Sequence, residues 1–199
     1  MNLQEFEVLL VAVTVMAALA VGSPALQRIL VYPQSESYTE LWLLGPGHLA
    51  GGVPYNVISG QSYNLYLGIA NHLGEAEYYS IQVKFRNQSQ SGPDGLNGTS
   101  SSLAPLYTLN VFVADKEGWE LPVAFSLDFS YDETHSLIRF NKLMFNSADL
   151  DLTGLETSWD PSRRAFFGNL IFELWIYNST VGGFQYHERY VDLKFNMIV

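Results

Sequence analysis

The sequence contains no cysteine, which excludes disulfides, thiolate metal sites and cysteine nucleophiles. It also contains few basic residues: 10 Lys plus Arg stand against 20 Asp plus Glu, giving a formal net charge of -10. A chain this acidic lacks the basic stripe that neutralises the phosphates of DNA or RNA. We therefore expect no nucleic-acid partner.

The common catalytic motifs are absent as well. There is no Gly-x-Ser-x-Gly nucleophile elbow and no Gly-rich phosphate loop after a strand. Carboxylates are plentiful, but their number alone cannot select an acid/base pair. The histidines are too far apart in sequence to form a metal-binding pair on one element. They are His48, His72, His135 and His187. We therefore expect a protein that is not an enzyme.

What the sequence does contain is an apolar N-terminal stretch. Residues Val8 to Gln27 carry no charge, and Arg28 follows them. As a helix this stretch would be about 30 Å long, which matches the hydrocarbon core of a bilayer. The main alternative is a cleaved signal peptide, but the basic residues that normally begin one are missing. We predict a membrane anchor in residues 1–32 and one globular domain in residues 33–199.

Three N-glycosylation sequons follow the apolar stretch. Their acceptor residues are Asn87, Asn97 and Asn178. Sequons favour an extracytoplasmic location for the domain that carries them. Asn97 lies in the polar segment Gln88–Ser102, which we expect to be a mobile surface loop that buries nothing. We predict glycans at Asn97 first and at the other two sites second.

The rest of the chain has the composition and periodicity of strands. Aromatic residues make up 14%, including 12 Tyr and 12 Phe, which favours pleated surfaces. Alternating apolar residues bounded by turn signals predict an immunoglobulin-like antiparallel β-sandwich. The predicted strands are Tyr38–Leu44, Tyr63–Ile69, Tyr79–Phe85, Tyr107–Val113, Val123–Tyr131, Leu137–Phe145, Phe166–Tyr177 and Phe184–Val199.

Two hairpins follow from these strands. The segments 63–69 and 79–85 are predicted to pair around a turn near Gly74, and the last two strands around Val181–Gly183. In the last hairpin, a register that pairs Tyr177 with Tyr186 also pairs Phe172 with Val191 on the core face. The same register predicts an outward-facing aromatic patch, a surface type that often binds protein or sugar. Its members are Trp175, Tyr177, Tyr186 and Tyr190.

An acidic segment, Ser147–Arg164, suggests a metal hypothesis. Its oxygen-bearing side chains are spaced around Gly154 as in calcium-binding loops. The flanking residues do not form convincing helices, and Glu156 stands where such loops prefer an apolar residue. The alternative is a plain solvated acidic loop. The calcium ligands predicted by this hypothesis are Asp149, Asp151, Thr153 and Asp160.

The segment PQSESYTELWLLGP after the apolar stretch, and GIANHLGEAEYYSIQV further on, resemble an archaeal membrane-protein family catalogued as domain of unknown function 1616. The resemblance continues through GWELPVAFSL, LIFELWIY and YHERYVDLKFNMIV. Typical members have several membrane helices before the sandwich, whereas this chain has room for one. The resemblance implies an archaeal cell-envelope domain with an immunoglobulin-like fold, and it supplies no catalytic residues.

Together these features predict a non-catalytic, single-pass membrane protein with its C-terminal domain on the extracytoplasmic side. We expect it to be an accessory or structural subunit of a cell-envelope or integral-membrane assembly, with other protein subunits as partners. One alternative is a pilin-like filament subunit, since Glu5 precedes the apolar stretch, although no basic leader ending in Gly is present. Another is a carbohydrate-binding module that uses the aromatic patch on envelope glycans.

Overall fold

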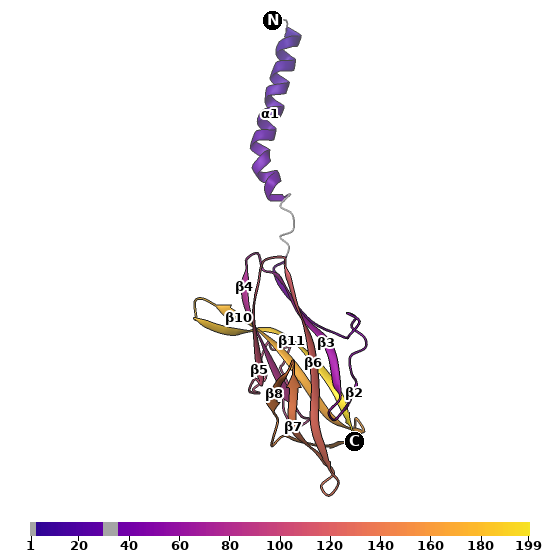
Figure 1. Ribbon diagram of the computed structural model, residues 1–199. Coiled ribbons are helices and arrows are strands. Elements are labelled where there is room, and N and C mark those ends of the chain that lie inside the picture. The colour runs from indigo at the N-terminus through magenta and orange to yellow at the C-terminus, as the bar shows by residue number, and fades with distance from the viewer. Residues whose placement is uncertain (1–2, 30–35) are drawn as a thin grey trace. The chain divides into compact units, whose positions relative to one another are not determined.

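The computed structural model describes residues 3–29 and 36–199. These residues belong to two units, a helix α1 (Leu3–Ile29) and a β domain (Tyr38–Val199), which are considered separately (Figure 1). The predicted boundary between residues 32 and 33 lies outside the described residues.

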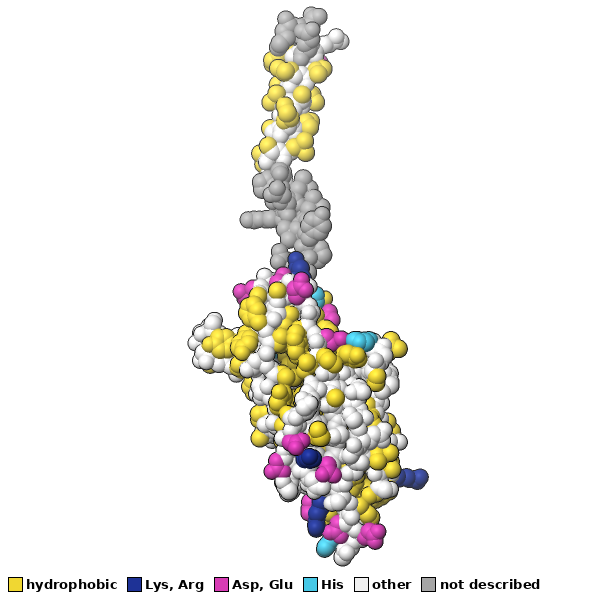
Figure 2. Space-filling model, viewed as in Figure 1, with side chains coloured by type: hydrophobic (Ala, Val, Ile, Leu, Met, Phe, Trp, Pro, Cys, Tyr) yellow, Lys and Arg dark blue, Asp and Glu magenta, His cyan; other side chains and the backbone are white. Residues whose placement is uncertain are grey.

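The predicted N-terminal helix is confirmed. Four consecutive residues, Val8 to Val11, are each more than half exposed, so α1 has no single apolar face. Hydrophobic side chains accordingly appear along its length in Figure 2. Among the described residues, no helix combines the length and apolarity needed to cross a membrane.

The β domain confirms the predicted all-β class and is built on one curled sheet (Figure 1). In one half the strands pair in the order β1-β3-β6-β7, and in the other half β10 pairs with β11 on one edge and with β4 on the other. Strand β9 pairs with both β7 and β10 and so joins the halves. The strands are β1 (Tyr38–Leu44), β2 (Asn56–Ile58), β3 (Ser62–His72), β4 (Glu77–Arg86), β5 (Tyr107–Val113), β6 (Gly118–Asp132), β7 (Leu137–Phe145), β8 (Ala148–Asp151), β9 (Glu156–Asp160), β10 (Ala165–Asn178) and β11 (Gly183–Ile198).

Aromatic rings fill the core between the two halves. Phe85 of β4 lies 4.9 Å from Phe140 of β7, and Phe145 of β7 lies 6.2 Å from Phe172 of β10, measured between ring centroids. Offset and edge-on ring contacts of this kind add to the free energy gained by burial alone. The inward residues of β6 alternate as predicted. The buried ones are Val123, Phe125, Leu127 and Phe129.

The predicted hairpin around Gly74 is wrong. Strand β3 pairs with β1 and β6, whereas β4 pairs with β5 and β10. The turn near Gly74, whose φ is 93°, therefore carries the chain from one half of the sheet to the other. Alternation makes each strand amphipathic, but it does not determine which strand lies beside it.

The acidic segment Ser147–Arg164 is likewise not one long loop, because it contains β8 and β9. β8 turns back on β7, with Leu150 opposite Leu143, and both leucines are buried. The acidic residues of β8 occupy its outward positions. The sequence of the segment is therefore typical of a solvated loop.

The most buried strand is β10, in which every residue from Ala165 to Leu174 is buried. Its inner face packs on the core. The segment Gln88–Ser102, which we call the covering segment, covers part of its outer face, since Ser101 is 7% exposed and bonds to Glu173. The prediction that this segment buries nothing is therefore wrong at its C-terminal end.

A buried ion pair connects the covering segment to the sheet. Lys84 Nζ lies 2.7 Å from Glu173 Oε2, and the two side chains are at most 3% exposed. The backbone N–H and the hydroxyl of Ser101 both donate to Glu173 Oε1, at 2.8 and 2.5 Å. The Trp175 ring lies 5.8 Å from Lys84 Nζ. Both carboxylate oxygens are thus satisfied, as a buried charge requires.

We predict that breaking this ion pair destabilises the domain strongly. Glu173→Gln and Lys84→Met should each cost about 3–5 kcal/mol, because each leaves the other side chain buried without its partner. The exposed pair between Lys142 and Asp149, 3.3 Å apart, provides the control. Lys142→Met should cost at most about 1 kcal/mol in the same urea denaturation experiment. Equal losses for the buried and exposed variants would contradict this account.

Candidate binding surface

The β10–β11 hairpin has two registers. From Phe166 to Leu174 the strands pair as predicted, with Phe172 opposite Val191. Beyond Leu174 the register shifts, and Trp175 instead of Tyr177 lies opposite Tyr186. The predicted pairing of Tyr177 with Tyr186 is therefore wrong by two residues.

A bulge in β11 causes this shift. Arg189 is opposite Leu174 and Tyr186 is opposite Trp175, so His187 and Glu188 have no opposite residues. Glu188 has a φ of 53°, a left-handed conformation that helps the strand accommodate the extra residues. Because the bulge contains an even number of residues, the side chains beyond it keep their inside–outside alternation.

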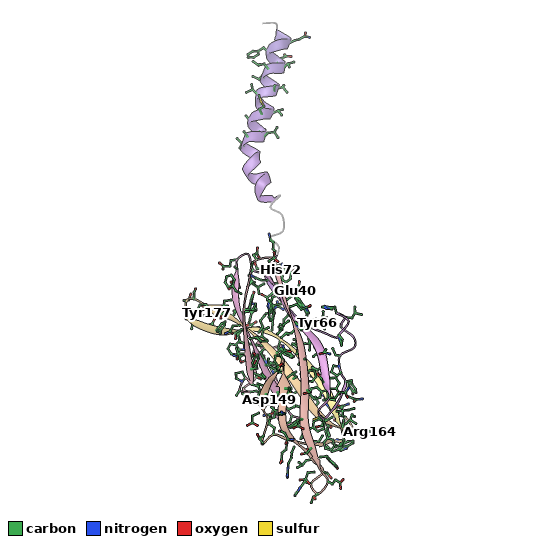
Figure 3. All side chains as sticks on the ribbon, in the orientation of Figure 1. Glu40, Tyr66, His72, Asp149, Arg164 and Tyr177 are labelled. Carbon is green, nitrogen blue, oxygen red and sulfur yellow. The ribbon has the colours of Figure 1, made fainter. Side chains whose placement is uncertain are left out.

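Beyond the bulge, four aromatic residues form a row across the outer face of the sheet. Phe112 of β5 is opposite Tyr78 of β4, and Tyr177 of β10 is opposite Phe184 of β11. The Tyr78 ring lies 6.3 Å from Tyr177 and 5.2 Å from Phe184. Phe112 is 67% exposed, while Tyr177 is 41% exposed and labelled near the projecting end of the hairpin in Figure 3. We call these four residues the aromatic row.

The rest of the predicted aromatic patch is less accessible. Trp175 and Tyr186 are partly buried and lie 5.7 Å apart. Burial, and next the negative charge of Glu173, raise the pKa of Tyr186 to about 12, so this phenol remains protonated. Tyr190 lies beneath the covering segment, where a β-carbon on Gly95 would be 3.6 Å from the Tyr190 ring. Of the four predicted patch residues, only Tyr177 is in the exposed aromatic row.

An open groove of about 480 Å³ lies beside the aromatic row. It forms because β10 pairs with β4 only as far as Ile176, whereas it continues with β11 to Asn178. The end of the hairpin thus separates from β4. Tyr78 and Phe112 line one part of the groove, Tyr177 and Asn178 another.

The groove also has an acidic side, formed by Glu75 and Glu77. These residues follow the turn after β3, whose last residue, His72, pairs with Tyr38. The groove therefore lies at the end of the β domain where the chain enters it. In Figure 2, acidic, basic and hydrophobic side chains lie close together at this end of the β domain, which is drawn uppermost.

A chain of buried hydrogen bonds supports this end of the domain. His187 Nε2 lies 2.9 Å from Thr39 Oγ1, which lies 3.2 Å from the Tyr79 hydroxyl. The Tyr79 hydroxyl donates to Asn71 Oδ1 at 3.2 Å, and Asn71 Nδ2 donates to the Val113 carbonyl at 2.9 Å. The bonds connect five strands from both halves of the sheet. Satisfied buried networks of this kind fix one arrangement of the strands.

The predicted calcium ligands are not gathered into a site. Asp149 forms an ion pair with Lys142, and Asp151 accepts hydrogen bonds from the backbone and hydroxyl of Thr153. Asp160 accepts bonds from Ser162, on a different strand end. In the part of the chain that the structure describes, no three His, Cys, Asp or Glu residues are placed to hold a metal ion. Asp151 and Asp160 instead accept hydrogen bonds within their own turns.

The three sequons differ in accessibility. Asn97 is exposed, although its Nδ2 bonds to Asp94. Asn178 is partly buried at the groove, and its Nδ2 donates to Gln185. Asn87 is only 7% exposed, and its Nδ2 donates to the Glu156 carbonyl at 2.7 Å. A glycan on Asn87 would have to break that bond, so the folded domain disfavours this site.

Sequence reasoning missed three members of the aromatic row, Tyr78, Phe112 and Phe184. One signal was available, because two strands that otherwise alternate carry apolar residues on both faces near one end. These residues are Tyr78-Tyr79 and Val111-Phe112-Val113. A strand that is apolar on its outer face near one end indicates a second surface to cover or use.

We predict that protonation of His187 destabilises the domain as the pH falls below the ordinary histidine pKa of 6.5. Burial, and next the charge of Arg189, lower the pKa of His187 from its ordinary 6.5. The unfolded chain therefore binds this proton at a higher pH than the folded domain does. The contribution of neutral His187 to the free energy of unfolding is therefore complete well above pH 6.5. It should be lost as the pH falls through the folded pKa.

Urea denaturation at several pH values tests this prediction. The variant His187→Gln should show a smaller fall between pH 7.5 and 5.5 than the unmodified chain. His48→Gln, at a ring 54% exposed, should retain the fall. An unchanged pH dependence in His187→Gln would contradict the assignment.

Comparison with known proteins shows the family but no function. No curated protein sequence matches the chain. Similar solved structures include a β-glucosidase from Listeria innocua in complex with glucose, with 11% identity and a TM-score of 0.36, covering 83% of this chain but only 17% of the enzyme. They also include the CARDB domain of the PF1109 protein from Pyrococcus furiosus in complex with di-metal ions, with 7% identity and a TM-score of 0.39, covering 82% of this chain and 90% of that domain. A family model matches residues 33–165, more than half of the sequence, and the chain therefore belongs to the family described as domain of unknown function (DUF1616).

Proposed function

We propose that this chain is a non-catalytic accessory subunit of a cell-envelope or membrane-protein assembly. In this proposal the N-terminal helix anchors it in a membrane, and the β domain recognises another protein on the extracytoplasmic side. The observation that carries the proposal is the exposed aromatic row. Soluble domains rarely leave several large aromatic side chains adjacent on one face unless that face binds something.

The geometry of the row suits protein recognition. Aromatic side chains bury a large area on contact and lose little conformational entropy, so they dominate many interfaces. The row crosses β5, β4, β10 and β11, and its support by a four-strand sheet keeps the rings in place before binding.

We also assign the β domain to the immunoglobulin-like sandwiches. Its mainly antiparallel strands, and the aromatic contacts that join β4 and β10 to β7 across one core, support this assignment. The parallel pairing of β2 with β11 departs from a simple antiparallel arrangement.

Two features support the anchored, outward-facing arrangement. The uncharged stretch from Val8 to Gln27 is long enough to span a bilayer core as a helix, and its exposed apolar side chains have no partner among the described residues. Asn97 is an exposed sequon, as an extracytoplasmic domain would present.

We predict that the full chain sediments with membranes and is released by detergent. The variant Val15→Arg/Leu19→Arg should move to the soluble or aggregated fraction, because each arginine near the centre of a spanning helix costs about 2.5–3.5 kcal/mol. Gln4→Arg, outside the apolar stretch, is the control and should remain with the membranes. A full chain found in the soluble fraction without detergent would overturn the anchor.

We predict that the aromatic row is needed to hold the partner. Phe112→Ser and Tyr177→Ser should each lower recovery of the co-purifying protein from detergent extracts by at least about tenfold, since aromatic anchors often contribute 2 kcal/mol or more. Tyr55→Ser, at a side chain 68% exposed elsewhere, should leave recovery unchanged. Quantitative mass spectrometry measures the recovery. Equal recovery with all three variants would contradict the proposed function.

A further inference from the structure

No ion pair to the acidic side of the groove is found in the part of the chain that the structure describes. Glu75 and Glu77 line the groove together with Tyr78, Phe112 and Tyr177. The ion pairs found among the described residues involve eight acidic residues, and neither Glu75 nor Glu77 is one of them. The residues that line the groove include no lysine or arginine. Lys116 lies on the neighbouring turn, where its backbone N–H donates to the Asn71 carbonyl, and its side chain forms none of the ion pairs among the described residues.

The surroundings of Glu77 disfavour its negative charge. Burial, and next the negative charge of Glu75, raise the pKa of Glu77. A positive charge placed in the groove would oppose both effects, because it would offset the repulsion and compensate for the lost hydration.

The aromatic wall favours the same type of ligand. A Lys ammonium or Arg guanidinium is attracted to the face of a tyrosine or phenylalanine ring, and its aliphatic stem packs against apolar surface. The groove is open and has a volume of about 480 Å³, which admits one or two long side chains from a segment lying across it. Ser179 on the opposite wall supplies a polar group for the backbone of such a segment.

We propose that this groove binds an arginine- or lysine-containing segment of the partner protein, with Glu75 and Glu77 pairing with the cation and the aromatic row holding its stem. This inference rests on the proposed function, since it names the chemistry of the partner. It commits to a basic protein segment because a neutral sugar would leave the two carboxylates uncompensated.

The test uses the full chain in nonionic detergent and two peptides, acetyl-Gly-Arg-Gly-Arg-Gly-amide and its citrulline counterpart. Citrulline has nearly the shape of arginine but no charge. The arginine peptide should bind at least about fivefold more tightly, because its cation pairs with the partly buried Glu77 and lies against aromatic rings. The Glu75→Gln/Glu77→Gln variant should weaken binding of the arginine peptide by a similar factor.

A matched control removes the same charge elsewhere. Glu133→Gln/Asp149→Asn alters two exposed carboxylates on other turns and strands, and at 0.15 M salt it should change the affinity by less than about twofold. Equal binding of the citrulline peptide, displacement of the arginine peptide by a neutral oligosaccharide, or an equal effect of the two double variants would overturn the inference.

The outcomes separate this inference from the function on which it rests. If Phe112→Ser and Tyr177→Ser lose the native partner while Glu75→Gln/Glu77→Gln keeps it and binds both peptides alike, the interaction role stands and the cationic ligand is wrong. If the aromatic variants keep the native partner, the proposed function itself fails.

Discussion

Glu173 places a carboxylate in the most buried strand of the domain, where an unpaired charge would cost several kcal/mol. Lys84 from the neighbouring strand supplies the opposite charge, and Ser101 satisfies the remaining oxygen. Both contacts are needed to compensate the buried charge of Glu173, so the covering segment must lie against the sheet at Ser101. The covering segment consequently closes the outer face of β10 around Glu173, and the aromatic row is left exposed beyond the bulge.

That end is where the two halves of the sheet are fastened by polar contacts. The bonds from His187 through Thr39 and Tyr79 to Asn71 join strands that are far apart in sequence. A rigid network behind the groove keeps its walls in place. Binding there would require little ordering of the domain, which favours affinity.

Much of the secondary structure could be predicted from alternation. The predicted bounds of β1, β5 and β7 match those observed. β5 alternates with a period of two, and β1 ends at the turn residues Gly45-Pro46-Gly47. Pairing could not be predicted in the same way. The predicted hairpin around Gly74 is wrong because β3 and β4 belong to opposite halves of the sheet. Each strand buries its apolar face in the core from its own half. β8 and β9 were missed because their outward positions are acidic.

The candidate surface shows the same limit. Tyr177 could be predicted to face outward from its own strand, but its neighbours Tyr78 and Phe112 come from strands 65 residues or more away, whose positions depend on pairing with β10. The bulge at His187 and Glu188 could not be predicted, because alternation is the same before and after it.

The bulge also has an evolutionary consequence. Because the insertion contains an even number of residues, it shifts the outer part of the hairpin along its partner without turning any side chain over. The segment from Trp175 to Tyr186 can therefore lengthen, shorten or change composition while the core pairs below Leu174 keep their register. The fold thus separates a scaffold of fixed register from a tip whose residues can change without disturbing the core.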